Sequence, residues 1–281
     1  MIVVKSYDKL KDYVQMWVDG YTDLLIIEGS AGMGKTSMVK EVLYENRDKA
    51  RAICINSHIT PVMAYKTLYE NRDKLIWYDD IYQLLINQLN VSILKQLCET
   101  REVKKVSYYS TSKQLEKEQV PLEFNTTSRV LITCNAVSGN NPHVMAVKDR
   151  GFHIVFKPTR NELINHLQTV SIGYDLLDDK GKEEVLKVIE YNSKFIKNLS
   201  LRTLIKGFQL YKHAKLTNRD WLPDFLDLLG IDEKLKVVTE LLNKYNTDKD
   251  RLKEWEWSER SYYRYKAIIG QTNQPFCQTV N

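Results

Sequence analysis

Short apolar runs alternate with helical patterns through the first half of the chain. Each run is nearly continuous rather than alternating, as is typical of parallel strands covered on both faces. Between the runs, apolar residues recur at helical spacing. The predicted strands are residues 23–28, 50–56, 74–78, 129–133 and 152–156, and the predicted helices are 36–45, 61–71, 81–87 and 91–100. This alternation predicts an α/β fold with a parallel sheet.

The alternation of predicted strands and helices is interrupted at two places. Residues 102–128 contain two β-like pieces around a polar run, which predicts a hairpin inserted before the fourth strand. After Pro158 the pattern is wholly helical, and Gly230 is a plausible stop between two helical groups. The predicted parts are an α/β core at 1–157, a helical region at 158–230, a small helical domain at 231–271 and a flexible tail at 272–281.

Composition narrows the class of protein only a little. With 43% hydrophobic and 27% charged residues, the 281-residue chain has the balance of a globular protein rather than a disordered or fibrous one. The net charge of +5 permits a nucleic-acid partner without requiring one. No run is long and apolar enough for a membrane span, and no signal peptide is visible, so we expect a cytoplasmic protein without membrane contact.

The four cysteines show no paired spacing, which argues against a disulfide framework or a zinc site. Cys54 and Cys134 fall inside predicted strands, and we expect both to be small core residues.

A glycine-rich segment follows the first predicted strand and opens the next helix. It matches G-x-x-x-x-G-K-[ST] at every fixed position, in the strand–helix context that the motif requires. Backbone N–H groups of such a loop and the helix N-terminus bind phosphate oxygens, the lysine neutralises the β- and γ-phosphates, and the threonine hydroxyl joins the Mg²⁺ shell. The predicted nucleotide-binding residues are Gly29, Ser30, Ala31, Gly32, Met33, Gly34, Lys35, Thr36 and Ser37. We therefore expect ATP with Mg²⁺ as the ligand.

Two further strands end in polar residues. Asp79 and Asp80 follow the run 74–78, and Asn135 follows 129–133. A carboxylate at the end of a strand beside the P-loop strand meets Mg²⁺ through water, so we expect Asp79 in that role. Asp80 then stands where a catalytic base polarises the attacking water, and Asn135 where a side chain orients it. The alternative is that these residues only cap helices or terminate strands.

Together these residues resemble the AAA+ ATPases. The resemblance covers roughly residues 20 to 215 and implies an α/β core followed by an all-α lid at 158–230. It implies that Arg150 is an arginine finger that reaches the γ-phosphate in a neighbouring copy, and that Arg202 is a second sensor in the lid. A trans-acting finger implies a homo-oligomer, either a hexameric ring or a helical array.

One residue departs from the family. Most members carry Glu where this chain has Asp80, and the shorter side chain puts its role as base in question. An Asp-Asp pair does occur among helicase loaders and related phage ATPases. The region 60–109 also resembles ATPases of phages and mobile elements.

Two segments are candidates for contact with DNA. Residues 257–266 resemble the second helix of a helix–turn–helix, and the alternative is a packing helix with core aromatics. The inserted hairpin occupies the position of the pore hairpin of ring helicases, and the alternative is a solvated surface hairpin. The predicted DNA-binding residues are Arg260, Tyr263, Arg264 and Lys266 in the first segment and Lys113 and Lys117 in the second.

The sequence thus predicts an ATP-dependent AAA+ motor or remodeller that acts on DNA in replication of a phage or mobile element, in the manner of a helicase. One alternative is a loader or regulator that assembles on DNA and recruits a helicase, transposase or other replication protein. Another is a nucleotide switch that controls a protein partner without DNA.

Overall fold

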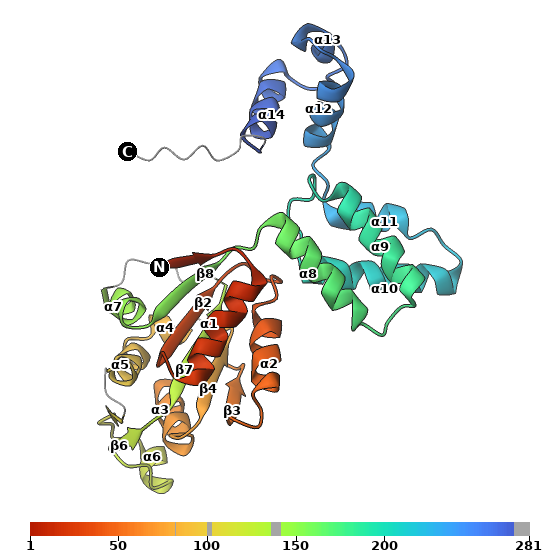
Figure 1. Cartoon of the computed structure of the whole chain (residues 1–281). Coiled ribbons are helices and arrows are strands. Elements are labelled where there is room, and N and C mark those ends of the chain that lie inside the picture. The colour runs from red at the N-terminus through yellow and green to blue at the C-terminus, as the bar shows by residue number, and fades with distance from the viewer. Residues whose placement is uncertain (82, 100–102, 136–141, 273–281) are drawn as a thin grey trace. The chain divides into compact units, whose positions relative to one another are not determined.

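A computed structural model of the chain describes residues 1–81, 83–99, 103–135 and 142–272 (Figure 1). The fold divides into two compact units, residues 1–166 and 167–281. The division falls inside helix α8 (Arg160–Ile172), and each unit is described separately below.

The first unit is built on a six-stranded sheet in the order β1-β8-β2-β7-β4-β3. All five neighbouring pairs in this sheet are parallel. The carboxyl ends of all its strands therefore lie on one edge. The strands are β1 (Ile2–Val4), β2 (Leu24–Glu28), β3 (Ala52–Ile55), β4 (Leu75–Asp79), β7 (Arg129–Cys134) and β8 (Phe152–Phe156).

Helices cover both faces of the sheet (Figure 1). Helices α1 and α2 pack together on one face, and α3, α5 and α7 form the layer on the other. This arrangement gives the central strands β2, β4 and β7 two buried faces, which explains their continuous apolar runs in the sequence. The helices of this unit before α8 are α1 (Tyr7–Asp19), α2 (Lys35–Glu45), α3 (Pro61–Glu70), α4 (Gln83–Ile86), α5 (Gln88–Leu97), α6 (Lys113–Lys117) and α7 (Pro142–Arg150).

Alternate residues of the central strands enter different layers of the core. Leu24 and Ile26 of β2 belong to the cluster that also contains Leu94 of α5. Leu25 and Ile27 are equally buried but lie outside that cluster, as expected for side chains on the opposite face. The central strands are therefore fixed in register by burial on both sides.

The inserted segment forms an antiparallel pair, β5 (Lys104–Ser107) with β6 (Glu123–Thr126), and the short helix α6 lies between them. Its apolar side chains Val106, Leu115 and Phe124 belong to the same buried cluster as α3. The Tyr65 hydroxyl of α3 donates a hydrogen bond of 2.8 Å to the carbonyl of Pro121. The hairpin is thus packed against the core along one side.

The second unit is wholly helical. Asp178, Ser200 and Asp232 cap its helices α9, α10 and α12 by accepting hydrogen bonds from backbone N–H groups in the first turn. Gly207 lies where a Cβ would come within 2.7 Å of the Phe225 ring, so α10 and α11 pack closely there. These helices are α9 (Asp179–Asn192), α10 (Leu201–Thr217), α11 (Leu222–Leu229), α12 (Glu233–Lys244), α13 (Asp248–Lys253) and α14 (Glu259–Thr272).

The last three helices share a small core of their own, formed by Val238, Leu241, Trp255 and Tyr262. Asp248 at the start of α13 ties it to α14. Hydrogen bonds from Lys266, from the Tyr262 hydroxyl and from Arg251 hold the pKa of Asp248 well below its ordinary value. These three helices are therefore held together by the buried cluster and by the hydrogen bonds to Asp248.

The structure confirms the α/β fold with a parallel core sheet, the inserted hairpin and the helical region that follows. Four elements were not predicted: β1, α1, α6 and α7. The expectation for Cys54 is wrong, because β3 is an edge strand and Cys54 is exposed, whereas Cys134 is fully buried. The predicted tail lies, apart from residue 272, outside the described residues, as does Cys277. No helix among the described residues is long and apolar enough to span a bilayer.

Candidate nucleotide site

The glycine-rich loop joins β2 at the centre of the sheet to the N-terminus of α2. Gly32 and Gly34 have φ values of 74° and 84°, which L-residues with side chains rarely adopt. At Gly29 a Cβ would lie 2.7 Å from the Phe156 carbonyl oxygen of β8, so the loop must pass close to the neighbouring strand. The backbone conformation therefore explains why glycine is needed at these three motif positions.

Lys35 is the first residue of α2, and its side chain folds back over the loop. It is only 8% exposed, and its Nζ donates hydrogen bonds to the carbonyls of Gly29 (2.5 Å) and Ser30 (2.9 Å). A third contact of 3.4 Å reaches Oδ1 of Asn135. The ammonium group is thus held at the centre of the loop, where it can exchange carbonyl contacts for phosphate oxygens.

Asp79 ends β4 and meets the loop directly. The hydroxyls of Thr36 and Thr133 both donate to Oδ1 of Asp79, at 2.9 and 2.6 Å. Thr133 in turn accepts a hydrogen bond of 3.1 Å from the indole N–H of buried Trp77. The Trp77–Thr133–Asp79 chain fixes the carboxylate beside the P-loop hydroxyl.

The sequence-based placement of Asp79 needs one correction. It assumed that the carboxylate strand lies beside the P-loop strand, but β7 lies between β2 and β4. Thr36 still reaches Asp79, because the loop projects beyond the strand ends at the same edge of the sheet. Thr133, which holds Asp79 in place, was not predicted as a site residue. Its only sequence signal is a hydroxyl near the end of an otherwise apolar strand.

Asp80 and Asn135 are brought together at the same edge. Asn135 Nδ2 donates a hydrogen bond of 3.0 Å to Oδ1 of Asp80, and both side chains are exposed. Asp80 has a φ of 59°, a left-handed conformation that Asp and Asn tolerate best among side-chain-bearing residues. Its N–H bonds to the Thr133 carbonyl at 2.9 Å, which anchors this conformation. One amide therefore links the candidate base to the ammonium of the P-loop lysine.

Tyr7 at the start of α1 supports the loop from outside the motif. Its hydroxyl donates a hydrogen bond of 3.0 Å to the Met33 carbonyl, and its ring stacks on His166 at a centroid distance of 3.8 Å. Burial and the charge of Glu162 raise the pKa of Tyr7, so the hydroxyl keeps its proton. Sequence analysis missed this contact because it joins segments that no local pattern connects.

Of the two arginines of the AAA+ resemblance, Arg150 lies in the first unit and Arg202 in the second. Arg150 is exposed at the end of α7, before the amino end of β8, whereas the P-loop lies at the carboxyl edge of the sheet. Strand β8 has five residues, and a strand rises about 3.3 Å per residue. The length of this strand therefore separates Arg150 from the P-loop of the same copy by roughly 15 Å. Arg202 is exposed in the first turn of α10, in the second unit.

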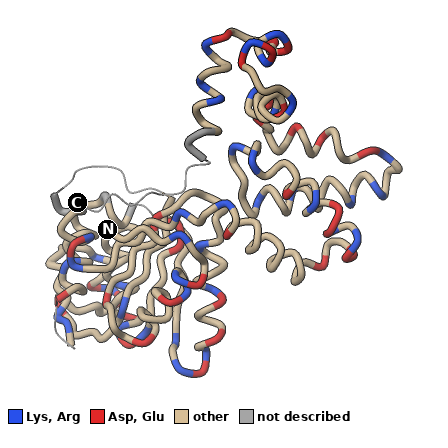
Figure 2. Tube along the Cα trace, turned by 45° about the horizontal axis from the view of Figure 1, so that its top comes forward, with Lys and Arg blue, Asp and Glu red and all other residues tan. Residues whose placement is uncertain are grey.

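The candidate DNA-binding residues of the C-terminal segment lie on α14. Arg260, Tyr263 and Arg264 are exposed, one turn apart on the same face, and Figure 2 shows positive charges along this helix. Lys266 instead forms an ion pair with Asp248. The first three residues are therefore available to a partner, while the fourth is engaged within the chain.

In the hairpin, Lys113 and Lys117 are exposed on α6. The other two lysines of the hairpin strand β5, Lys104 and Lys105, form ion pairs with Asp23 and Glu123. Only the α6 lysines of this set are thus left for an outside partner.

The donor set beside the P-loop suits a hard divalent cation. A threonine hydroxyl and a carboxylate lie within hydrogen-bond distance of each other, and Mg²⁺ prefers such oxygen ligands together with water and phosphate oxygens. Thr36 and Asp79 are the residues that would hold it, and the ion would neutralise charge on the β- and γ-phosphates.

No protein-family model matches the chain. Domain III of the Thermotoga maritima replication initiation protein DnaA has a TM-score of 0.48 and 14% identity, covering 80% of this chain and 94% of that one. AMPPCP-bound DnaA from Aquifex aeolicus has a TM-score of 0.48 and 12% identity, covering 98% and 91%.

One curated relative matches by sequence. It is described as an uncharacterized 36.7 kDa protein in the nrdC-mobD intergenic region of Enterobacteria phage T4, and it is 24% identical over 206 residues. The match covers 67% of this chain and 63% of that protein, which is less than two thirds of the relative's length. The chain thus has a parallel α/β core with a P-loop, followed by helices, and it is similar in sequence to a phage protein.

Proposed function

We propose that this chain hydrolyses ATP with Mg²⁺ in an assembly of several copies and acts on DNA during replication of a phage or mobile element. The observation that carries the proposal is the hydrogen-bonded set of Lys35, Thr36, Asp79, Asp80 and Asn135 at one edge of the sheet. These are the groups that bind phosphates, hold Mg²⁺ and place a water molecule in P-loop ATPases.

The proposed division of labour follows from the contacts. Lys35 binds the β- and γ-phosphates, and Thr36 with Asp79 holds the metal ion. Asp80 accepts a proton from the attacking water while Asn135 keeps that carboxylate oriented by its 3.0 Å hydrogen bond.

Arg150 supports the oligomeric part of the proposal. Arg150 lies before the amino end of β8, and the length of that strand separates it from the P-loop of the same copy. This separation argues against contact between Arg150 and a γ-phosphate bound in the same copy. Because Arg150 is exposed, it can enter the site of a neighbouring copy. An arginine in that position speeds hydrolysis by about 10³–10⁵-fold. Arg202 of the lid is proposed to contact the phosphates as well.

DNA contact is proposed for the exposed face of α14. Arg260 and Arg264 can reach phosphates from successive turns, and Tyr263, 45% exposed, lies between them. Deleting residues 231–281 should therefore weaken salt-sensitive DNA binding. Full affinity in the truncated protein would refute this part of the proposal.

The loader form of the function is favoured by a specific observation. The hairpin is packed against α3 through Val106, Leu115 and Phe124, and of its aromatic residues Tyr109 is the exposed one. A motor that grips DNA with this hairpin would depend for phosphate contacts on the exposed Lys113 and Lys117. Reversing both charges should abolish DNA-stimulated hydrolysis in a motor and leave it unchanged in a loader.

Hydrolysis itself is tested by Asp80→Asn. We expect nucleotide affinity to stay within about twofold while turnover falls by about 10²–10⁴-fold, the usual contribution of a general base. Turnover measured with a phosphate-release assay and binding measured with a fluorescent ATP analogue separate the two effects. If the parent protein shows negligible turnover and Asp80→Asn changes nothing, the chain is a nucleotide switch.

A further inference from the structure

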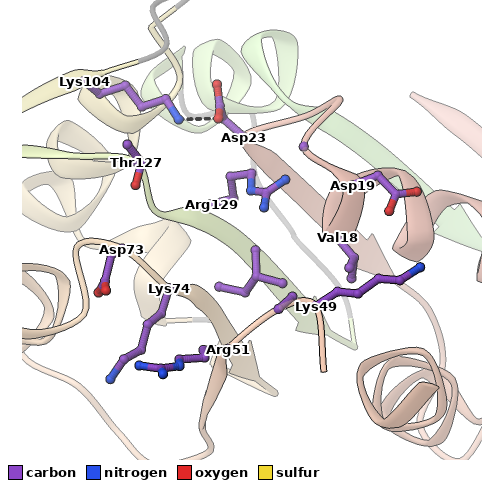
Figure 3. A pocket seen from close by; sticks show the side chains of 13 residues that line it. Val18, Asp19, Asp23, Lys49, Arg51, Asp73, Lys74, Lys104, Thr127 and Arg129 are labelled. Atoms are coloured by element: carbon purple, nitrogen blue, oxygen red, sulfur yellow. Dashed lines mark hydrogen bonds and ion pairs between the residues drawn. The ribbon is translucent and has the colours of Figure 1, made fainter. Parts of the chain in front are cut away.

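A hollow opens at the amino edge of the sheet, opposite the edge that carries the P-loop. It has a volume of about 830 Å³ and is formed where β2, β4 and β7 begin and where α1 and α2 end (Figure 3). Its lining is dominated by charge, with five cationic side chains and three carboxylates. The cationic residues are Lys49, Arg51, Lys74, Lys104 and Arg129, and the carboxylates are Asp19, Asp23 and Asp73.

The charges in this hollow are only partly neutralised within the chain. Lys104, 2% exposed, forms an ion pair with Asp23, so these two cancel. Among the described residues, Lys49, Arg51 and Arg129 form no ion pair. The hollow therefore presents more positive charge than its own carboxylates balance.

Arg129 differs from the exposed cations Lys49 and Arg51 in being partly buried. It is half-buried at the first position of β7, and burial lowers its pKa while the charges of Asp23 and Asp19 oppose that effect. Its guanidinium lies against Gly20, where a Cβ would collide with it, so the left-handed C-cap of α1 leaves room for this side chain. Arginine stays charged even in such places, and a buried charge without a partner is costly.

A second hollow of about 540 Å³ adjoins the first along the edge strand β3. The two share Ala50, Arg51 and Lys74 in their linings, and the backbone bond from Leu75 to the Arg51 carbonyl holds their common wall together. The second hollow adds Lys40 and Arg47, with no carboxylate among the described residues that line it. The two hollows thus lie side by side with basic residues in both linings, and we call them together the basic groove.

An exposed aromatic ring lies at the far end of this groove. Tyr44 is 68% exposed, and the Arg47 guanidinium lies over its ring at 4.3 Å. A basic track with an aromatic ring beside it is how proteins bind single-stranded nucleic acids, since phosphates meet cations and bases stack on rings.

We propose that this groove binds the sugar–phosphate backbone of single-stranded nucleic acid, with Lys49, Arg51 and Arg129 contacting phosphates and Tyr44 stacking on a base. The spread of cations over both hollows and the exposed ring favour a nucleic-acid strand over a compact polyphosphate or an acidic peptide. The groove shares no residue with the P-loop, α14 or α6. It rests on the proposed function only in taking nucleic acid as the partner.

The test uses the full chain and a fluorescein-labelled oligothymidylate. In Lys49→Glu/Arg51→Glu, two exposed cations of the groove are reversed without touching its buried part. The matched control is Lys194→Glu/Lys212→Glu, which makes the same charge change on exposed lysines of the second unit. Affinity is measured by anisotropy at several salt concentrations. The same proteins are assayed for basal ATP turnover and for binding of tripolyphosphate and polyglutamate.

We expect the groove variant to bind oligothymidylate at least about tenfold more weakly, with a salt slope smaller by about 1.4 for two lost phosphate contacts. The control variant should bind as the parent does, and basal ATP turnover should be unchanged in both. Equal binding by the groove variant and the parent, or an equal loss in the control, overturns the proposal. So does a groove variant that loses only tripolyphosphate or polyglutamate.

Two failures remain distinguishable. If the parent binds duplex DNA but no oligothymidylate, only the groove proposal fails, and if it binds neither, the DNA part of the proposed function fails as well. If the parent binds and Asp80→Asn abolishes turnover while the groove variant still binds normally, only the groove proposal fails.

Discussion

Replacing Thr133 by valine removes one hydroxyl from the chain of bonds behind Asp79. Valine keeps nearly the same shape, but the Asp79 carboxylate loses the 2.6 Å bond from Thr133 and keeps only the 2.9 Å bond from Thr36. The Trp77 indole N–H, on a residue that is 1% exposed, loses its 3.1 Å acceptor. The substitution therefore disturbs both the metal-site carboxylate and a buried donor.

Two magnitudes follow from these contacts. A buried donor left without an acceptor costs about 1–3 kcal/mol, so the free energy of unfolding should fall by roughly that amount. Loss of a group that orients a metal ligand costs about 10–100-fold in metal affinity. We therefore expect the Mg²⁺-dependent part of ATP binding to weaken by about that factor, with binding in EDTA changed much less.

The assay is a titration of a fluorescent ATP analogue with and without Mg²⁺, alongside urea unfolding. Thr133→Ser keeps the hydroxyl and should restore most of the Mg²⁺ effect. Thr126→Val is a control, because Thr126 is also buried and bonded, to the Arg72 carbonyl in the hairpin region, and should cost stability only. Unchanged Mg²⁺ dependence in Thr133→Val would refute the positioning role of Thr133.

Three further predictions test other parts of the structure. Gly29→Ala should weaken nucleotide binding, measured by the same titration, because its Cβ would lie 2.7 Å from the Phe156 carbonyl. Tyr7→Phe should lower ATP affinity by a few-fold, seen in the same assay, since the loop loses a hydrogen bond of about 0.5–1.5 kcal/mol. Asp248→Ala should destabilise the C-terminal helices by about 1–3 kcal/mol, seen by tryptophan fluorescence in urea, because the Tyr262 hydroxyl loses its acceptor. Since the folded pKa of Asp248 is lowered, the parent's advantage over the variant should be present above pH 3.8 and fade as pH falls below it.

The sequence predicted the five central strands because burial on both faces leaves a continuous apolar run, which is a local signal. It did not predict β1, which is three residues long, and it missed α1 although Ser6 caps it and Leu10, Val14 and Trp17 lie on one face. Strand order is not a local property, so the edge position of β3 could not be foreseen.

The candidate site was predictable to a similar extent. The P-loop, Asp79, Asp80 and Asn135 were found because each stands at a strand end, where parallel strands bring polar groups to one edge. Thr133 was missed because its role depends on the register that pairs it with Asp79. The groove at the opposite edge draws its cations from four separate segments of the chain, and no motif joins them.

The central claim, an ATP site completed by a second copy, is tested most directly by mixing two variants. Lys35→Ala removes the phosphate-binding ammonium and Arg150→Ala removes the finger, and each protein alone should have little turnover. In an equal mixture, Arg150→Ala copies supply intact P-loops and Lys35→Ala copies supply intact fingers, so about a quarter of the parental turnover should return. A mixture as inactive as its components, or full turnover by Arg150→Ala alone, would contradict a site shared between copies.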